Sequence, residues 1–208
     1  MKKYLMLTFV SVFLGLFVAN NASAVTVTGA LVGNYSTSTS GSVSSAGVST
    51  ETKLDAGAMG FGAGFLFEFA MGPSAGFEIG TLYNMRKAEG SAQLAGLNVT
   101  VTDTESYLDL PVLIKLHFGA FQIGFGGYYS VPAGKHKTEV TLSNGIVSAT
   151  ASGSVKENFD YGAAGALGFT FSKQILLEGR YKHGMHDTTK GGSVDKWQEM
   201  QVLLGLVF

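Results

Sequence analysis

The stretch WQEMQVLLGLVF, residues 197–208, has the two-residue periodicity that decides the fold. The apolar members of this alternation are Met200, Val202, Leu204, Leu206 and Phe208. Such alternation predicts a half-buried β-strand that reaches the last residue of the sequence. In an open sheet this strand would be an edge with unpaired backbone groups, and closure of the sheet into a barrel removes the edge. The stretch therefore favours a barrel, with an amphipathic strand of a soluble sandwich as the alternative.

The N-terminal segment has the organisation of a secretory signal peptide. Two lysines precede an apolar run over residues 5–19, and the small residues at 22–24 form a cleavage pattern. The apolar run is short for a helix that spans a bilayer. We therefore predict a cleaved signal peptide at residues 1–24 and one mature domain at residues 25–208.

Composition narrows the class of protein further. The sequence contains no Cys, which excludes small secreted scaffolds held together by disulfides. It contains no second apolar run long enough for a transmembrane helix, so strands must form any membrane span. Removal of Lys2 and Lys3 takes the formal charge from -1 to -3, and this weak balance does not indicate nucleic acid as a partner.

Seven segments upstream of the terminal stretch alternate in the same way and predict further strands. They cover residues 25–35, 57–70, 75–87, 104–118, 121–131, 159–171 and 175–186. Long polar segments at residues 36–55, 88–103, 132–158 and 187–196 alternate with short turns at residues 71–74, 119–120 and 172–174. This alternation of long and short connections is typical of outer-membrane barrels, in which the long loops are extracellular and the short turns periplasmic.

Aromatic residues separate along the predicted strands in a way that indicates two membrane interfaces. Near the short turns, the apolar face carries Phe67, Phe69, Phe77, Phe118, Phe121, Phe169, Phe171 and Phe208. Near the long loops, it carries Tyr35, Tyr83, Tyr129, Tyr161 and Trp197. We interpret these two sets as aromatic girdles at the two surfaces of a bilayer.

Three stretches carry a family resemblance: YLDLPVLIKLHFG at residues 107–119, EGRYKHG at residues 178–184, and the terminal strand. With them, the mature chain resembles the small outer-membrane barrels of the OmpA and OmpX type, the porin-like outer membrane protein β-barrel domains. The resemblance implies an all-β fold. The implied barrel is eight-stranded, antiparallel, up-and-down and transmembrane, with short periplasmic turns and long extracellular loops.

The resemblance also gives the terminal strand a role in assembly. Its residues are similar to the C-terminal signal by which outer-membrane barrels are recognised for insertion. The implied signal consists of Trp197, Val202, Leu204, Leu206 and Phe208. The partners expected are outer-membrane lipids and the insertion machinery, which would contact the C-terminal strand. The barrel is expected to be a monomer in the bacterial outer membrane.

Pro111 departs from the rules for strands. It lies inside the predicted strand at residues 104–118, but it has no N–H group to donate to a neighbouring strand. A closed barrel has no edge at which the missing donor would be harmless. We therefore expect a local bulge at this position.

Charged residues on the inward faces predict a charged lumen. If the apolar faces point to lipid, the inward set includes Glu68, Glu78, Arg86, Asp109, Lys115, Glu178, Arg180, Lys182 and Glu199. An eight-stranded barrel is only wide enough to be filled by its own side chains, and charges removed from water must be paired. We therefore predict an ion-pair cluster that plugs the lumen, with a functional gate or ion path as the alternative. The expected bridges run from Arg180 and Lys115 to Glu68, Glu78 and Glu178.

No motif in the sequence predicts catalysis. The glycines at positions 60, 62 and 64 share one face of a strand, unlike the glycines of a phosphate-binding loop. His183 and His186 point to opposite faces of one strand, so they do not form a metal site without further ligands. No catalytic residue, cofactor or metal is therefore assigned, and no enzyme activity is expected.

Together these features predict an integral outer-membrane protein with a structural or surface-interaction role carried by its four loops. The first alternative is a narrow passive pore for small solutes or ions. The second is a soluble, secreted, lipocalin-like binding protein, which would place the Phe-rich face inside and the charged face outside.

Overall fold

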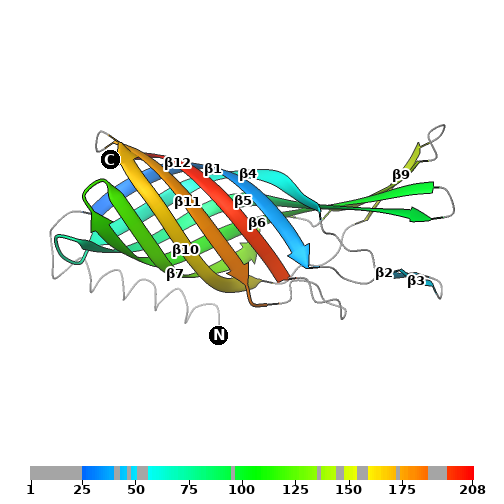
Figure 1. Ribbon diagram of the computed structural model, residues 1–208, viewed down its shortest axis with the longest axis horizontal. Coiled ribbons are helices and arrows are strands. Elements are labelled where there is room, and N and C mark those ends of the chain that lie inside the picture. Colours follow the sequence, from blue (N-terminus) through cyan, green and yellow to red (C-terminus); the bar gives the residue numbers. More distant parts are fainter. Residues whose placement is uncertain are drawn as a thin grey trace.

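The computed structural model describes residues 25–39, 43–45, 48–50, 56–94, 97–134, 137–143, 148–153, 159–171, 174–186 and 196–208. The predicted signal peptide, residues 1–24, lies outside these residues. Over the described residues the secondary structure consists of β-strands (Figure 1). No helix in this part of the chain is long and apolar enough to cross a membrane.

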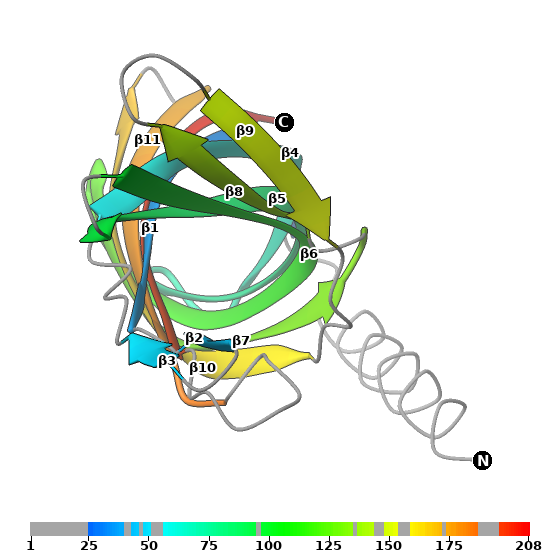
Figure 2. The same cartoon turned by 90° about the vertical axis from the view of Figure 1, so that its right-hand side faces the viewer.

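Eight long strands form a closed antiparallel barrel, which confirms the predicted fold class (Figures 1 and 2). They are β1 (Val25–Thr39), β4 (Ala56–Ala70), β5 (Ala75–Leu94), β6 (Leu97–Phe118), β7 (Phe121–Pro132), β10 (Asp160–Phe171), β11 (Ile175–Gly184) and β12 (Lys196–Val207). Around the ring the order is β5-β4-β1-β12-β11-β10-β7-β6, and pairing of β5 with β6 closes it. The first and last strands, β1 and β12, are neighbours, so no strand of the ring is left with an open edge.

Side chains alternate between the membrane-facing wall and the lumen as the sequence predicts. In β12, Leu204 is 54% exposed, whereas the adjacent Leu203 is fully buried. The phenylalanines of β4 point outward, and Phe61 is 64% exposed. This arrangement excludes the lipocalin-like alternative, which requires the Phe-rich face inside the barrel.

Three of the predicted polar loops contain strands, so their assignment as loops is wrong, and two of them extend the barrel sheet. β5 extends beyond residue 88 to Leu94, and β6 begins at Leu97, before the predicted start at residue 104. The two strands pair along this whole extension, up to Leu94 and Leu97. In the third predicted loop, β8 (Lys137–Ser143) pairs with β6, and β9 (Ser148–Gly153) pairs with β8. Figure 1 shows the β5–β6 hairpin projecting well beyond the barrel. β8 and the start of β6 alternate Val or Leu with small polar residues, and β9 contains only Ser, Ala, Thr and Gly, so the contrast in polarity was too weak to reveal the strands.

The first predicted loop, residues 36–55, also differs from the expectation. β1 runs to Thr39, and a small separate sheet pairs β2 (Val43–Ser45) with β3 (Val48–Thr50). The part of the fourth predicted loop at residues 187–195 lies outside the described residues. Of the short turns, the one between β6 and β7 uses Gly119 at φ +67°, a conformation that favours glycine.

Pro111 causes no bulge, so that expectation is wrong. It lies opposite Tyr128 of β7 in an unbroken register. On its other side, β5 and β6 are not paired next to Pro111, between the pairs Ile79–Val112 and Leu82–Asp109, and the register is the same before and after this gap. A Cβ at Gly80 of β5 would lie 2.5 Å from the Leu66 side chain and 3.3 Å from the Pro111 ring, so the absence of a side chain there leaves room for both. The register irregularity of the barrel lies instead between Ala58 and Gly62 of β4.

Candidate functional site in the barrel lumen

The lumen near the short turns contains two carboxylates and two cations that contact one another, and these four residues are here called the turn-end group. Its members are Glu78, Lys115, Glu178 and Arg180, all nearly inaccessible to solvent. Arg180 contacts Glu78 at 2.6 Å and Glu178 at 2.5 Å. Lys115 contacts Glu78 at 2.7 Å and is also paired with Glu178. The two positive and two negative charges cancel within the group.

The contact between Arg180 and Glu78 crosses the full width of the barrel. Arg180 lies on β11 and Glu78 on β5, four strands apart in either direction around the ring. A long side chain can reach across because the neighbouring inward positions of β10 are small, as at Ala166, the register partner of Arg180. Gln122 of β7 adds a hydrogen bond to Glu178, with its Nε2 donating at 3.2 Å.

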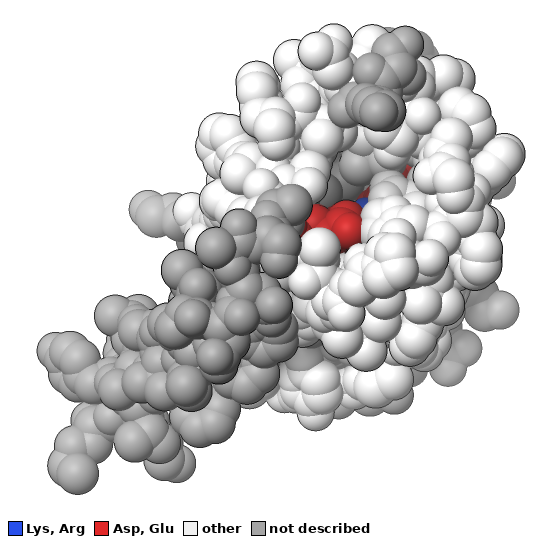
Figure 3. All heavy atoms as spheres, turned by 90° about the vertical axis from the view of Figure 1, so that its left-hand side faces the viewer, with Lys and Arg blue, Asp and Glu red and all other residues white. Residues whose placement is uncertain are grey.

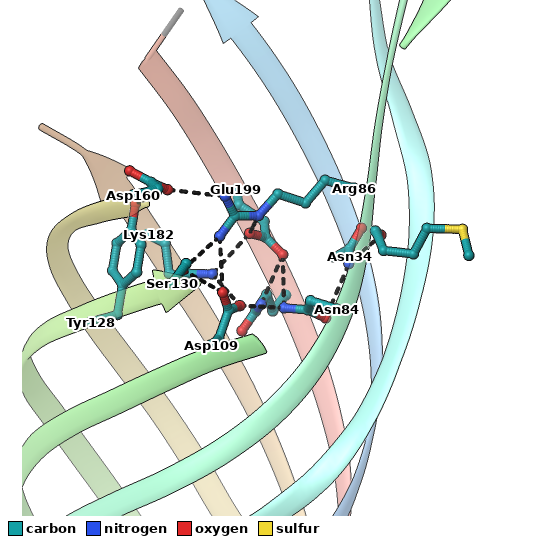
Figure 4. Close-up of polar contacts among 11 residues, drawn as sticks. Asn34, Asn84, Arg86, Asp109, Tyr128, Ser130, Asp160, Lys182 and Glu199 are labelled. Carbon is teal, nitrogen blue, oxygen red and sulfur yellow. Dashed lines mark hydrogen bonds and ion pairs between the residues drawn. The ribbon is translucent and has the colours of Figure 1, made fainter. Parts of the chain in front are cut away.

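A second cluster, here called the loop-end group, lies closer to the long connections and is centred on Arg86 (Figure 4). The Arg86 guanidinium is fully buried and contacts three carboxylates. The distances are 3.1 Å to Asp109, 2.9 Å to Asp160 and 2.9 Å to Glu199. Lys182 supplies the second cation and lies 2.6 Å from Asp109 and 3.0 Å from Glu199. With two cations and three carboxylates, these five residues carry one excess negative charge.

Neutral side chains add hydrogen bonds to the carboxylates of the loop-end group. Asn84 donates to Asp109 at 2.7 Å and to Glu199 at 3.3 Å, and Ser130 also donates to Asp109. The Tyr128 hydroxyl donates to Asp160 at 3.0 Å. The Lys182 ammonium lies 4.5 Å from the centre of the Tyr128 ring, in the geometry of a cation–π contact.

Eight of the nine predicted lumen residues belong to these two groups, and Glu68 does not. Arg180 and Lys115 bridge Glu78 and Glu178, but the expected bridge to Glu68 is absent from the contacts of the described residues. Glu68 instead contacts His117 at 2.5 Å, where both side chains are partly exposed. Its carboxylate bends over Gly76, and a Cβ there would lie 2.3 Å from Glu68 Oε1. Figure 3 looks into the barrel from the short-turn end and shows acidic side chains inside this opening.

Trp197 also differs from its predicted position. It is only 3% exposed and lies on the inward face of β12 with Glu199 and Gln201. Its assignment to the outer aromatic girdle is therefore wrong, and it does not share a face with the other residues of the implied insertion signal. Those residues, Val202, Leu204, Leu206 and Phe208, all point outward. The sequence already indicated this position, because Trp197 is two residues from Glu199 and residues two apart in a strand share a face.

Sequence reasoning missed Asp160, which is fully buried and bonded to Arg86. Its signal was its position: it precedes Gly162 and Ala164 by an even number of residues, so it shares their inward face. Among the described residues, no group of three or more His, Cys, Asp and Glu side chains has the arrangement of a metal site.

A closed eight-stranded barrel with an apolar outer wall and paired charges inside defines the class of transmembrane β-barrels. A family model described as "Outer membrane protein beta-barrel domain" matches residues 10–190. The chain belongs to this family and is a protein of the bacterial outer membrane. No curated protein sequence matches it significantly.

Similar solved structures are small outer-membrane proteins with little sequence identity to this chain. Ail of Yersinia pestis, in complex with the heparin analogue sucrose octasulfate, is 11% identical with a TM-score of 0.46, and the match covers 88% of this chain and 99% of Ail. Neisserial surface protein A is 9% identical with a TM-score of 0.40, covering 91% and 100%. The outer membrane protease OmpT of Escherichia coli is 10% identical with a TM-score of 0.39, covering 90% and 97%.

Proposed function

We propose that this protein is a surface-interaction protein whose barrel holds an extracellular β-sheet in the outer membrane and whose lumen is closed to solutes. The observation that carries the closed lumen is the set of ion pairs that cross it. Arg180 reaches from β11 to the opposite strand β5, and Arg86 reaches from β5 to carboxylates on β6, β10 and β12. A solute would have to break these contacts at both groups.

The space between the charged groups is also filled by the barrel's own side chains. Leu82, Leu113 and Leu203 point into the lumen and are almost inaccessible to solvent. This filling is expected for a ring of eight strands, whose interior is too narrow for a water channel of the porin type. Displacing the charges would in addition leave ions unpaired in a medium of low dielectric constant, at a cost of roughly 3–5 kcal/mol for each broken pair.

The projecting sheet supports the surface-interaction role. The extended β5–β6 hairpin, β8 and β9 form a continuous run of paired strands. In the orientation with the short turns in the periplasm, this sheet stands outside the cell, where it can meet other molecules. Loops and extensions on a rigid scaffold are the usual place for binding functions.

We propose no catalytic activity for the lumen groups. Each of their five carboxylates contacts at least one cation, so none is a free general acid or base. They are Glu78, Asp109, Asp160, Glu178 and Glu199.

A narrow cation pore is the second candidate, and one observation favours it. The loop-end group has one excess negative charge, and acidic side chains lie in the opening at the short-turn end (Figure 3). A lumen of this sign would admit small cations in preference to anions if the ion pairs opened.

Conductance of the purified protein, refolded and inserted in a planar bilayer, tests the proposal. The native protein should show no regular single-channel steps. Arg180→Ala should open discrete, cation-selective steps, because it removes the side chain that crosses the lumen. Tyr181→Ala is the matched control, since Tyr181 is the next residue of β11 but points outward and is 44% exposed. Regular steps from the native protein would overturn the closed lumen and favour the pore.

A further inference from the structure

The outer wall of the barrel contains an apolar groove that plays no part in the lumen. Its volume is about 670 Å³, which lies within the range of ligand sites in proteins. Four adjacent strands, β4, β1, β12 and β11, contribute to its lining. We propose that this groove is a binding site for one hydrocarbon chain of a membrane phospholipid.

The groove exists because a glycine interrupts a row of large outward side chains. At the level of Gly29 on β1, the register places Phe65 of β4 on one side and Leu206 of β12 on the other. A Cβ at residue 29 would lie 3.7 Å from the Phe65 ring and 3.8 Å from the Phe208 ring. The two rings therefore flank the bare backbone of Gly29, which is the floor of the groove.

The next row of side chains lengthens the groove. Leu31 of β1 has Ala63 of β4 and Leu204 of β12 as its register partners. The small Ala63 continues the gap on the β4 side, whereas Leu204 continues the wall on the β12 side. A bound chain would thus be contacted from below and from both flanks.

A small residue on the outer face does not by itself make such a site. Gly33 lies on the same strand and the same face, between Phe61 and Val202. A Cβ at Gly33 would meet no atom within 4 Å, so no side chain leans over it. The walls at Gly29 are therefore a specific feature of this part of the barrel.

The chemistry of the groove selects a hydrocarbon chain as its occupant. The residues that line it are all Gly, Ala, Leu, Ile or Phe, and no side chain among them can donate or accept a hydrogen bond. The groove is continuous with the apolar outer wall, which is the established interface with the membrane. It lies near the short turns, because Ile175 begins β11 and Phe208 ends the chain. In the orientation proposed above, this level belongs to the periplasmic leaflet, so we assign the chain to a phospholipid.

Photo-crosslinking in vesicles tests the site. The full mature chain would be refolded in phosphatidylcholine vesicles that contain a trace of phosphatidylcholine with a diazirine on one acyl chain. After irradiation, mass spectrometry of peptides should find the adducts concentrated around residues 29, 63–65 and 204–208. Gly29→Leu should reduce these adducts by roughly fivefold or more, because the new side chain takes the place of the lipid contacts. Gly33→Leu should leave them unchanged.

The alternative outcomes overturn the proposal. Adducts spread evenly over all outward strands, or adducts at the groove that persist in Gly29→Leu, would mean that the groove holds no particular chain. Crosslinks between two copies of the protein at these residues would identify a second barrel as the occupant. Heat-dependent mobility on a denaturing gel checks that each variant is folded. If Gly29→Leu does not fold, Ala63→Leu fills the groove from the neighbouring strand and provides the same comparison.

Discussion

Replacement of Arg86 by Met should strongly destabilise the barrel and admit water to the lumen. Arg86 is fully buried and contacts three carboxylates at 2.9–3.1 Å. Met fills much of the same space but carries no charge. Within the loop-end group, Lys182 would then be the one cation left against three negative charges. Leaving buried charge without compensation costs roughly 3–5 kcal/mol, so the free energy of unfolding should fall by about this amount.

The single Trp of the chain provides the assay, since Trp197 lies in the lumen two residues from Glu199 and is 3% exposed. Urea unfolding in lipid vesicles, followed by Trp197 fluorescence, would measure stability. The emission of the folded state should also shift to the red in Arg86→Met, because water enters beside the indole ring. Arg86→Lys keeps the charge and should lose much less stability.

A double substitution separates loss of pairing from loss of packing. Asp160 receives its cation contact from Arg86, so Arg86→Met combined with Asp160→Asn should recover part of the lost stability. If Arg86→Met unfolds at the same urea concentration as the native protein and its emission does not shift, Arg86 does not hold the loop-end group together.

The remaining predictions concern the outer wall, the sheet and the orientation. Leu204→Arg should lower stability by roughly 2–4 kcal/mol in vesicles, well beyond the loss in Leu204→Ala, and equal losses would contradict the assignment of this face to lipid. Gly60→Ala should cost about 1–3 kcal/mol by overpacking, because its Cβ would lie 1.9 Å from a carbonyl oxygen of β5, whereas Gly33→Ala meets no atom within 4 Å and should unfold like the native protein. On intact cells, Ser44→Cys should react with a membrane-impermeant thiol reagent and Ser74→Cys should not, and the reverse pattern would invert the orientation.

The barrel strands could be predicted because the two environments they separate differ so strongly in polarity. On β11, every second residue from Glu178 to Lys182 is charged, while the residues between them are Gly and Tyr and the residue before them is Leu. An error of one residue in such a strand would place charges in lipid, so the pattern has one sensible interpretation. The closure of β1 onto β12 followed from the same pattern at the end of the chain.

Two kinds of feature could not be predicted from the sequence. In the first, the two faces of a strand differ little in polarity, and in the second, the feature depends on a contact between residues that are far apart in the sequence. The extension of β6 alternates Val99 and Val101 with polar residues that tolerate water on either face, so it resembled a loop. Glu68 contacts His117 because its side chain lies over Gly76. This space is a feature of the folded sheet and cannot be read from the sequence. The position of Pro111 against Gly80 depends likewise on a contact between strands rather than on either residue alone.

The buried charges have a role that stability alone does not explain. A lumen filled with well-packed apolar side chains would be as stable as one filled with ion pairs, or more stable. It would, however, make the two faces of each strand alike, and a shift of one residue would then cost little. Arg180 and Lys182 prevent such a shift in β11, because each would then face lipid, where a cation costs up to roughly 2–4 kcal/mol depending on its depth in the bilayer. The pairing of Arg180 with Glu78 on the opposite strand then requires β5 and β11 to face each other across the ring. We infer that the charged side chains that cross the lumen also specify which face of each strand points inward and how the eight strands are arranged around it.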